Sequence, residues 1–493
     1  MKSIKWQLPV VLLLLVNLSC AVAQDGSLTP QMVERIRTEF EMDAHARTVR
    51  NALTSTSIKD IAVDRQIVSE HNEKFSHRIK TKGISNQKRS GRCWMFAGFN
   101  TIKPFIMNKL DLDDFEFSQI YLQFWDKMEK ANTFYEYMIE YRDRDLMDRS
   151  VIFLLKEPSQ DGGYWENFVD LVDKYGVIPK EAMAETASSE DTGMMNRILG
   201  RILRKDALEL REIYKKTGSA DQMRQAKQKM LAEIFRVLVV NLGEPPRQFN
   251  WRYKLKDKKD SGDTKEDKGK QEDSVKEKED EKGDDYKVEQ KWGELRVFTP
   301  KSFYEEFVGI DLHQYVNIAN DPIRPHGGQY EINMTKSLYD GHNARYASVD
   351  IGVLREVVIK MLLDNRAVCF AADVSIDQDG KTGIMASNLY DFESIYSIQM
   401  DLDKAGRILF RDSTINHSMT FIGVDLQDGK PVKWLVENSW GSERGSKGLW
   451  TMYDNWFEDN VYNVIAHKDY VPKEILQIFE KPVILLPVWD PMW

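Results

Sequence analysis

The chain has little cysteine: among its 493 residues only Cys20, Cys93 and Cys369 occur. A Cys93–Cys369 disulfide is formally possible, but we exclude it because it would consume the reactive thiol discussed below. Cys369 lies inside the continuous apolar run 367–372, which predicts a packed residue of a buried strand. Chemistry by cysteine is therefore expected at Cys93.

A basic surplus, metal-ligand spacing and phosphate-binding loops are also missing. The formal net charge is −9 and the pI is about 5.6, which argues against a nucleic-acid-binding surface, because such surfaces usually present a basic face. The eight histidines show no metal-ligand spacing, and no glycine-rich phosphate loop occurs. We therefore expect no metal, no other cofactor and no nucleic acid partner.

The apolar run near the N-terminus, residues 8–16, is too short for a transmembrane helix, which needs about 20 residues. A basic start precedes this run, and Ala21-Val22-Ala23 follows it as a cleavage signal before Gln24. We predict a signal peptide and export, to the periplasm or as a secreted protein. Lipidation of Cys20, and through it a membrane anchor, is a second interpretation. Leu18 lies two positions before Cys20, whereas lipoprotein signals generally have leucine three before.

The most informative segment is 87–97, which contains Gln87 and Cys93. The residues from Cys93 onward have helical character. This arrangement can place a thiolate at a helix N-terminus, with an amide donor directed at the carbonyl that the thiolate attacks. For Cys93 alone the alternative is a buried cysteine that simply packs as a small apolar residue.

Two downstream motifs supply partners for the thiol. His417 is flanked by small polar residues and followed by a strand-like apolar run, and Asn438 begins an Asn-Ser-Trp-Gly turn after a short strand. Cysteine, histidine and asparagine in this chain order are the parts of a papain-like cysteine peptidase. The alternative is three unrelated residues, and the presence of Gln87 together with both motifs disfavours it.

Each residue has a defined role in this chemistry. Pairing with an imidazolium at a helix N-terminus can lower a thiol pKa from about 8.5 to about 3.5, so Cys93 is the predicted nucleophile and His417 the holder of its proton. Asn438 is expected to accept a hydrogen bond from the other ring nitrogen without adding a negative charge. Gln87 and the backbone N–H of Cys93 are expected to donate to the oxyanion. Trp440 is expected to cover the histidine–asparagine contact from water.

The spacing differs from that of papain and the cathepsins. His417 lies about 324 residues after Cys93, whereas those enzymes leave about 130–150, and Ser90 stands where they carry a disulfide-forming cysteine. In these features the chain resembles the bleomycin hydrolase/aminopeptidase C family, the self-compartmentalising branch of the papain-like peptidases. The resemblance covers about 60–492. Further matching segments are Phe115-Glu116-Phe117-Ser118-Gln119, Asp161-Gly162-Gly163, Lys174-Tyr175-Gly176-Val177-Ile178-Pro179, Asn388-Leu389-Tyr390-Asp391 and Leu486-Pro487-Val488-Trp489-Asp490-Pro491-Met492.

The resemblance implies a thiol aminopeptidase that hydrolyses peptides through a thioester acyl-enzyme and assembles as a homohexamer. It implies that Gly162 and Gly163 border the substrate cleft, with a plain helix-initiating loop as the alternative. It also implies that the C-terminal tail lies in the cleft, blocks its non-primed side and attracts the substrate α-ammonium with its carboxylate. Here the chain stops at Trp493, where relatives usually continue with a few small residues. Either one extra subsite is open or Trp493 fills that space, and a tail that merely packs is the alternative.

The patterning along the chain predicts an α+β, papain-like two-lobe fold, in which a helical lobe and a β-rich lobe flank the site. Strands are expected at Met419–Val424, Val432–Val436 and Gly448–Tyr453, and the helix opened by Cys93 is expected to end or kink at Pro104. The expected segments are a signal peptide over 1–23, an N-terminal helical arm over 24–72, a helical lobe with Cys93 over 73–185, a helical insert over 186–340 with a disordered charged loop over 254–289, a β-rich lobe with His417 and Asn438 over 341–480, and a C-terminal arm in the active-site cleft over 481–493.

Three functional hypotheses follow from these observations. The first is a bleomycin hydrolase-like cysteine aminopeptidase that acts on peptides. The second is an exported papain-like endopeptidase, and the third is a non-catalytic scaffold or binding assembly that kept the fold. The presence of Gln87, Cys93, His417 and Asn438 together favours an enzyme, because only chemistry requires all four.

Overall fold

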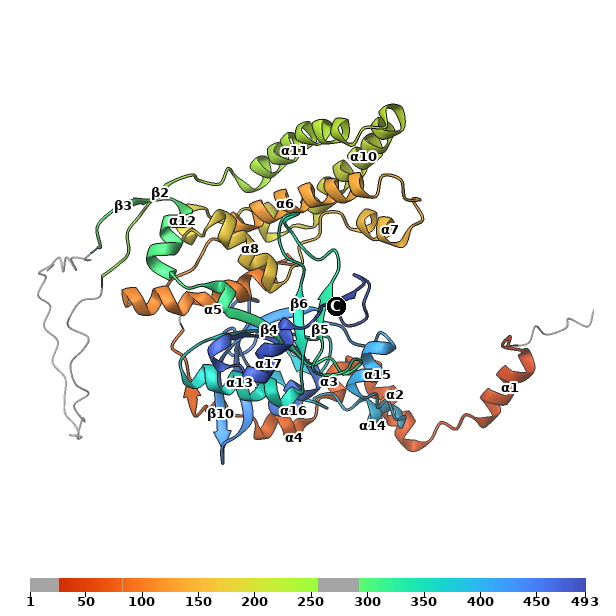
Figure 1. Cartoon of the computed structure of the whole chain (residues 1–493). Helices are drawn as coiled ribbons and strands as arrows, with labels where there is room; N and C mark the ends of the chain where they lie inside the picture. Colours follow the sequence, from red (N-terminus) through yellow and green to blue (C-terminus); the bar gives the residue numbers. More distant parts are fainter. Residues whose placement is uncertain (1–25, 82, 256–291) are drawn as a thin grey trace, which may run out of the picture. The chain divides into compact units, whose positions relative to one another are not determined.

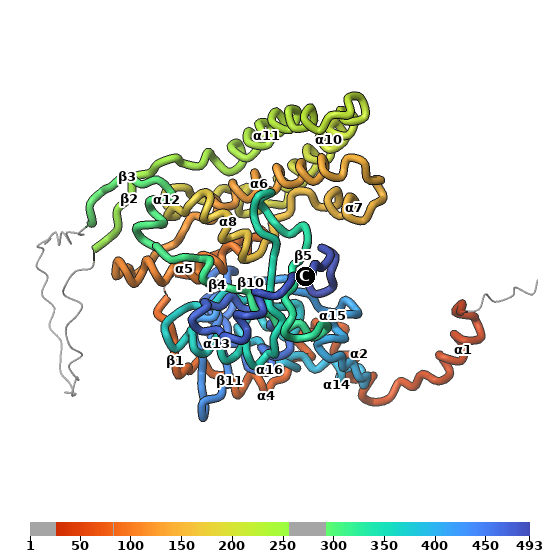
Figure 2. The backbone as a smooth tube through the Cα atoms, viewed as in Figure 1, coloured from red at the N-terminus to blue at the C-terminus, as the bar shows by residue number. Residues whose placement is uncertain are grey.

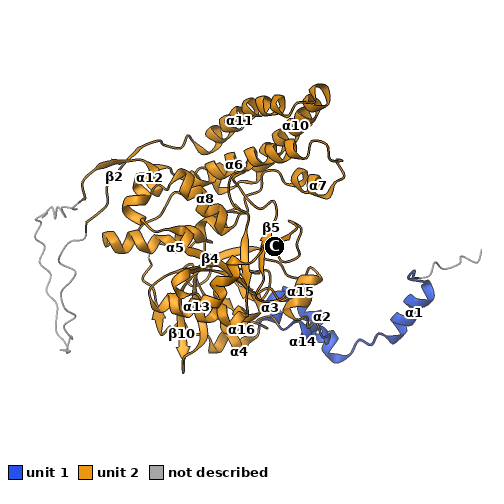
Figure 3. Ribbon diagram, in the orientation of Figure 1, with its two compact units in different colours: residues 1–63, 391–399 blue, residues 64–390, 400–493 orange. Residues whose placement is uncertain are grey.

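The computed structural model describes residues 26–81, 83–255 and 292–493 (Figure 1). The predicted signal peptide 1–23 and most of the predicted charged loop 254–289 lie outside these residues. The chain forms two compact units: one ends at Val63 and includes Asp391–Gln399, and the other comprises Asp64–Tyr390 and Met400–Trp493 (Figure 3). The predicted boundary at residue 72 is thus too late for the arm. The Asp64 N–H donates to the Leu389 carbonyl at 2.9 Å, which anchors the following residues in the larger unit.

The smaller unit is built from short helices whose N-caps are readable in the sequence. They are α1 (Pro30–Glu39), α2 (Ala44–Leu53), α3 (Ile58–Ala62) and α14 (Phe392–Tyr396). Thr29, Asp43 and Ser57 cap the first three by accepting backbone N–H bonds with their side chains. His45 Nε2 lies 2.9 Å from the Ser394 carbonyl oxygen, and α2 packs against α14.

The helices of the larger unit include long amphipathic ones, and α6, α10 and α11 pack together (Figure 1). Short 3-10 or π turns lie at Lys180–Ala182, Tyr304–Val308, Leu312–Gln314, Lys468–Tyr470 and Gln477–Glu480. The α-helices are α4 (Arg65–Glu70), α5 (Cys93–Leu110), α6 (Gln119–Glu140), α7 (Arg149–Lys156), α8 (Trp165–Tyr175), α9 (Ala187–Glu190), α10 (Gly193–Thr217), α11 (Ala220–Leu242), α12 (Pro300–Phe303), α13 (Ile351–Leu363), α15 (Lys404–Leu409), α16 (Asp454–Asn460) and α17 (Lys473–Leu476).

Among the described residues, the β-rich part forms one mixed sheet of twelve strands. Its order is β14-β5-β6-β4-β13-β7-β10-β11-β12-β9-β8, with β1 paired to β10, and β2 and β3 form a separate antiparallel pair. The strands are β1 (His77–Arg78), β2 (Phe249–Trp251), β3 (Arg296–Phe298), β4 (Tyr315–Ala319), β5 (Gln329–Ile332), β6 (Arg345–Ser348), β7 (Val368–Ala372), β8 (Gln378–Asp379), β9 (Ile384–Met385), β10 (His417–Gln427), β11 (Lys430–Glu437), β12 (Leu449–Tyr453), β13 (Val461–His467) and β14 (Ile484–Leu486). The backbone trace shows the C-terminal segment returning beside β5, with which β14 pairs in parallel (Figure 2).

The mixture of helices and sheet confirms the predicted α+β class. The three predicted strands are confirmed as parts of β10, β11 and β12, and Cys369 is confirmed as a buried residue of β7. The predicted helical insert over 186–340 is wrong at its end. Strands β4 and β5 fall in that range but pair with β13 and β6 of the large sheet, because their largely buried side chains require cover on both faces.

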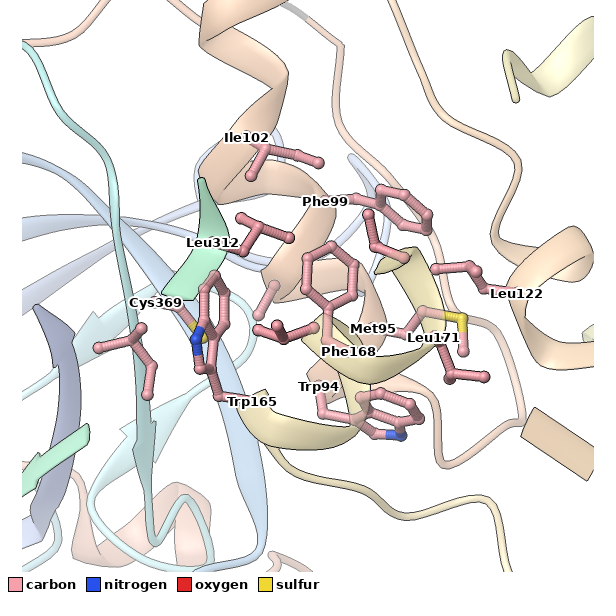
Figure 4. Packing of buried hydrophobic residues seen from close by; sticks show 14 of the residues in the cluster. Trp94, Met95, Phe99, Ile102, Leu122, Trp165, Phe168, Leu171, Leu312 and Cys369 are labelled. Carbon is pink, nitrogen blue, oxygen red and sulfur yellow. The ribbon is translucent and has the colours of Figure 1, made fainter. Parts of the chain in front are cut away.

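Helix α5 carries Cys93 at its first position and is buried almost along its length. A helix that is apolar on all sides is one that is surrounded by protein. Figure 4 shows Phe99 of α5 beside Phe168 of α8, with ring centroids 5.2 Å apart. Of the expected end or kink at Pro104, the end is wrong: α5 continues to Leu110. The backbone hydrogen bond that proline forfeits is outweighed by burial of its neighbours Ile102 and Ile106.

Candidate active site

A cavity of about 730 Å³ lies where the start of α5 faces the β7 and β10 strands. Most of the predicted site residues line it, although they come from distant parts of the sequence. They are Gln87, Cys93, Gly162, Gly163, His417 and Trp493. Asn438 and Trp440 are not on the cavity wall, and both contact His417 instead.

His417 begins β10 and is held on two sides. Its Nε2 lies 2.8 Å from Oδ1 of Asn438, and its ring stacks on Trp440 with centroids 4.7 Å apart. The N–H of Ser439 also donates to Asn438 Oδ1, at 2.7 Å, which identifies that atom as the acceptor oxygen. The Nε2 nitrogen must then carry the hydrogen, so the neutral ring leaves Nδ1 free to accept a proton.

The surroundings of Cys93 and His417 set the cost of charging them. Burial raises the pKa of the Cys93 thiol, while hydrogen bonds with the backbone of Ser418, Trp94 and Cys93 itself lower it. Burial also lowers the pKa of His417 to about 4, against the hydrogen bond to Asn438, which raises it. Each group taken singly is therefore held neutral. The two charges of the predicted thiolate–imidazolium pair must form together, so that each stabilises the other.

Gln87 is fixed by the turn that carries Asn438. Its side-chain oxygen accepts from the Ser439 hydroxyl at 2.6 Å, and its Nε2 donates to the Ser90 carbonyl at 2.6 Å. An amide nitrogen has two hydrogens, so one remains for the predicted oxyanion contact. Sequence analysis misses Ser439, whose position between Asn438 and Trp440 is the only signal for it.

Gly162 and Gly163 line the cavity together with their sequence neighbours Asp161 and Tyr164. A Cβ built on Gly163 would lie 2.5 Å from the Trp94 ring, so only glycine allows this backbone to approach the helix that carries Cys93. Trp94 Nε1 donates to the Asp161 carbonyl at 2.8 Å, which ties the same two segments. Asp161 is a second residue that sequence analysis misses, beyond its adjacency to the glycine pair.

The C-terminal segment contributes Trp493 to the cavity wall. The Trp493 ring lies beside Tyr346 and Tyr164, with centroids 5.0 and 6.0 Å apart. Met492 is fully buried, and its carbonyl accepts from the Ile415 N–H at 3.2 Å, two residues before His417. The tail is therefore packed against the segment that leads into the histidine strand.

Asp490 fixes the same tail electrostatically. Its carboxylate pairs with Arg324 and accepts the Met492 N–H at 3.0 Å.

Within the described residues no group of three or more His, Cys, Asp or Glu side chains could hold a metal ion. No helix of the described part combines the length and apolarity that a membrane crossing requires.

Comparisons with known proteins agree in family and in fold. The sequence profile of the Peptidase C1-like family matches residues 27–267 and 284–493. The chain is 34% identical to Aminopeptidase C of Streptococcus thermophilus over 94% of this chain and 98% of that one. It is 34% identical to human bleomycin hydrolase over 95% of this chain and 98% of that one. The crystal structure of PepW from Lactobacillus rhamnosis HN001 matches with a TM-score of 0.85 and 34% identity, covering 95% of this chain and 99% of that one.

Proposed function

The chain belongs to the Peptidase C1-like family and is a papain-like cysteine aminopeptidase, and we propose that Cys93, His417 and Asn438 are its catalytic residues. The observation that carries the proposal is the 2.8 Å contact between Oδ1 of Asn438 and Nε2 of His417, whose side chain lines the same cavity as Cys93. This contact leaves Nδ1 of His417 as the base for the thiol. The predicted scaffold without catalysis is set aside, because the chain matches aminopeptidases over nearly its whole length.

The reaction proceeds by acyl transfer in two halves. The Cys93 thiol gives its proton to His417, and the thiolate attacks the carbonyl carbon of the first peptide bond. The oxyanion is held by the N–H of Cys93 and the free amide hydrogen of Gln87. Collapse of this intermediate breaks the C–N bond, and the amine leaves with the proton from His417. Water then attacks the thioester, His417 takes its proton and returns it to the sulfur, and the N-terminal residue is released.

The C-terminal segment restricts this cleft to the ends of peptides. Trp493 occupies one part of the cavity wall and is held by Tyr164 and Tyr346. A peptide that continued past this point on its N-terminal side would collide with the indole ring. Peptides whose free N-terminus lies at this point therefore fit better than peptides that extend beyond it. Gly162 and Gly163, which also line the cavity, are proposed to contact the substrate backbone.

The gating role of the C-terminal segment is tested with matched peptides that carry free or acetylated N-termini. The parent enzyme should hydrolyse the free peptides and leave the acetylated ones nearly untouched. Removal of residues 490–493 should add internal cleavage. Trp493→Ala should do so in part while keeping the buried Met492 and the Arg324–Asp490 pair. Equal hydrolysis of both peptides by the parent, with no change in either variant, would show that the arm has no gating role and would favour the exported endopeptidase.

We also propose that the enzyme is exported and forms a hexamer. Export is supported by the basic start, the apolar run 8–16 and Ala21-Val22-Ala23. N-terminal sequencing of the mature protein should find Gln24 first, and a lipid-modified Cys20 at the N-terminus would instead identify the anchored form.

Assembly is supported by Met32 and Ile36, which lie one turn apart on α1 and are 41% and 54% exposed.

A further inference from the structure

A buried pair of opposite charges joins α6 to the loop 159–163 that borders the cavity. Nζ of Lys127 lies 2.7 Å from Oδ1 of Asp161, and the two side chains are 1% and 8% exposed. The same ammonium group donates to the carbonyl oxygens of Ser159 at 3.1 Å and Gln160 at 2.8 Å. A single cation therefore holds three successive residues of this loop.

A second lysine of α6 extends this contact to the glycine pair. Nζ of Lys130 donates to the Gly162 carbonyl at 2.5 Å, and Asp126 balances its charge at 2.8 Å. Lys130 also lies over the Trp94 ring, 5.5 Å from its centroid. Together the two lysines fix the backbone from 159 to 162 against one rigid helix.

Asp161 connects this loop to both sides of Cys93. Its Oδ2 accepts from the N–H of Gly91 at 3.0 Å, and its carbonyl accepts from Trp94 Nε1 at 2.8 Å. A Cβ built on Gly91 would lie 2.9 Å from the Asp161 Cβ, so the two backbones are as close as glycine permits.

The charge of Asp161 works against the thiolate that the reaction needs. Burial raises the pKa of the Asp161 carboxyl, but Lys127, Thr192 and Asn196 outweigh this and hold the pKa well below its usual range, so it stays ionised. The carboxylate in turn raises the pKa of Cys93. Lys127 is the cation that offsets this field, because it lies in direct contact with Asp161.

We propose that Asp161, held by Lys127, is a positioning residue that sets the distance between the substrate-binding backbone at Gly162–Gly163 and the nucleophile Cys93. The inference rests on the proposed roles of Cys93 and of the glycine pair. Lys127 has two functions in this proposal. Its ammonium group orients the loop 159–163, and its charge screens Cys93 from the Asp161 carboxylate. Because these functions are separable, the two residues predict different outcomes when each is changed.

Variants at Asp161 separate geometry from charge. Asp161→Ala removes the acceptor for Gly91 and should raise KM for peptides about 10-fold or more with a smaller change in kcat, since α5 itself remains in the core. Asp161→Asn keeps an acceptor and should raise KM less. Iodoacetamide alkylation of Cys93, followed by mass spectrometry across pH, should show a lowered thiol pKa in Asp161→Asn and a raised one in Lys127→Met. Alkylation needs no turnover, so its result stands even if the catalytic assignment fails.

The control is a second ion pair to the same helix, with side chains that are 15% and 8% exposed. Lys227 lies 2.5 Å from Glu136 of α6 and lines no part of the cavity. Lys227→Met should lower the thermal midpoint without changing KM or the alkylation profile. The double variant Lys127→Met/Asp161→Asn should recover thermal stability relative to Lys127→Met while KM stays raised. A parent-like KM and alkylation profile in Asp161→Ala, or an equal KM rise in Lys227→Met, would overturn the proposal.

Discussion

At the scale of single residues, the site depends on hydrogen bonds that leave one atom of each group free. Asn438 Oδ1 accepts from Ser439 and His417, and this leaves Nδ1 as the ring nitrogen that is free to accept a proton. Gln87 donates one amide hydrogen to the Ser90 carbonyl, and its second amide hydrogen remains available. Because Cys93, His417 and Asn438 have different proposed roles, mutation of each residue should have a different effect.

Cys93→Ser should abolish peptide hydrolysis, with a loss in kcat on the order of 10⁴-fold or more. A serine hydroxyl is too weak an acid to give its proton to His417 at neutral pH, although its size lets the protein fold. Steady-state hydrolysis of a free-amine peptide, with thermal unfolding as the folding control, checks this. Activity near the parent level would contradict the assignment of the nucleophile.

His417→Ala should be nearly as damaging as Cys93→Ser, because the two residues act as one unit. Asn438→Ala should be milder, about 10- to 100-fold, which is the worth of one hydrogen bond to a charged ring. Comparing kcat for the two variants tests the orienting role. If a folded Asn438→Ala enzyme were as inactive as His417→Ala, orientation alone would not describe the asparagine.

At the scale of secondary-structure elements, the start of α5 and the strands β7 and β10 supply the two faces on which the site is assembled. Helix α5 places Cys93 at its N-terminus, and α8 begins directly after the glycine pair. Helix α8 also carries the half-buried Glu166, whose Oε1 accepts from the Arg345 N–H at 3.3 Å. Burial raises the pKa of Glu166 to about 7, against hydrogen bonds with the backbone of Glu166 and Arg345.

This shift predicts how stability depends on pH. A carboxyl whose folded pKa is raised binds its proton more tightly in the folded state, so its contribution is complete below pH 4.5 and is lost as pH rises to about 7. Glu166→Gln should therefore be more stable than the parent at pH 8, by on the order of 3 kcal/mol, and similar to it at pH 4.5. Urea unfolding at both pH values measures this. The exposed α10 substitution Glu212→Gln should show no such gain, and a parent-like Glu166→Gln at pH 8 would refute the prediction.

At the scale of the whole molecule, we predict that the charged segment around 254–289 can be removed without loss of activity. The residues on its two sides are joined already: the Gly293 N–H donates to the Tyr253 carbonyl at 2.8 Å, and β2 pairs with β3. The family profile also leaves 268–283 unmatched. A loop whose ends are fixed close together can be shortened at little entropic cost.

Replacing residues 256–289 with a short Gly-Ser linker should preserve both assembly and peptide hydrolysis. Sedimentation velocity should find a hexamer for the parent and for this variant, in keeping with closed symmetric assembly. A monomer at working concentration for both proteins would refute the hexamer. A monomer for the variant alone would place the charged segment in the assembly contact, contrary to what we expect.

The sequence by itself specified the candidate reactive residues, because the patterns that indicate their chemistry are local. A thiol before a helical run, a histidine opening a strand and an Asn-Ser-Trp-Gly turn are patterns of a few residues each. The strand β7 around Cys369 and the central strands β10 to β12 were predictable for the same reason, since continuous or alternating apolar runs specify burial directly. The boundary of the insert was not predictable, because β4 and β5 are recognised as sheet only through their partners β13 and β6.

Only the tertiary structure decided how these residues are held. Gln87 meets Ser439, Asp161 meets Lys127 and Gly91, and Trp493 meets Tyr346 across separations that no local pattern records. Pro104 shows the same limit within a single helix. Proline propensity predicts an end or a kink there, and α5, buried almost along its length, continues past it to Leu110. Local propensity and side-chain chemistry are properties of short segments. The partners of a buried polar group depend on which distant segments the fold brings together, and this is set by packing of the whole chain.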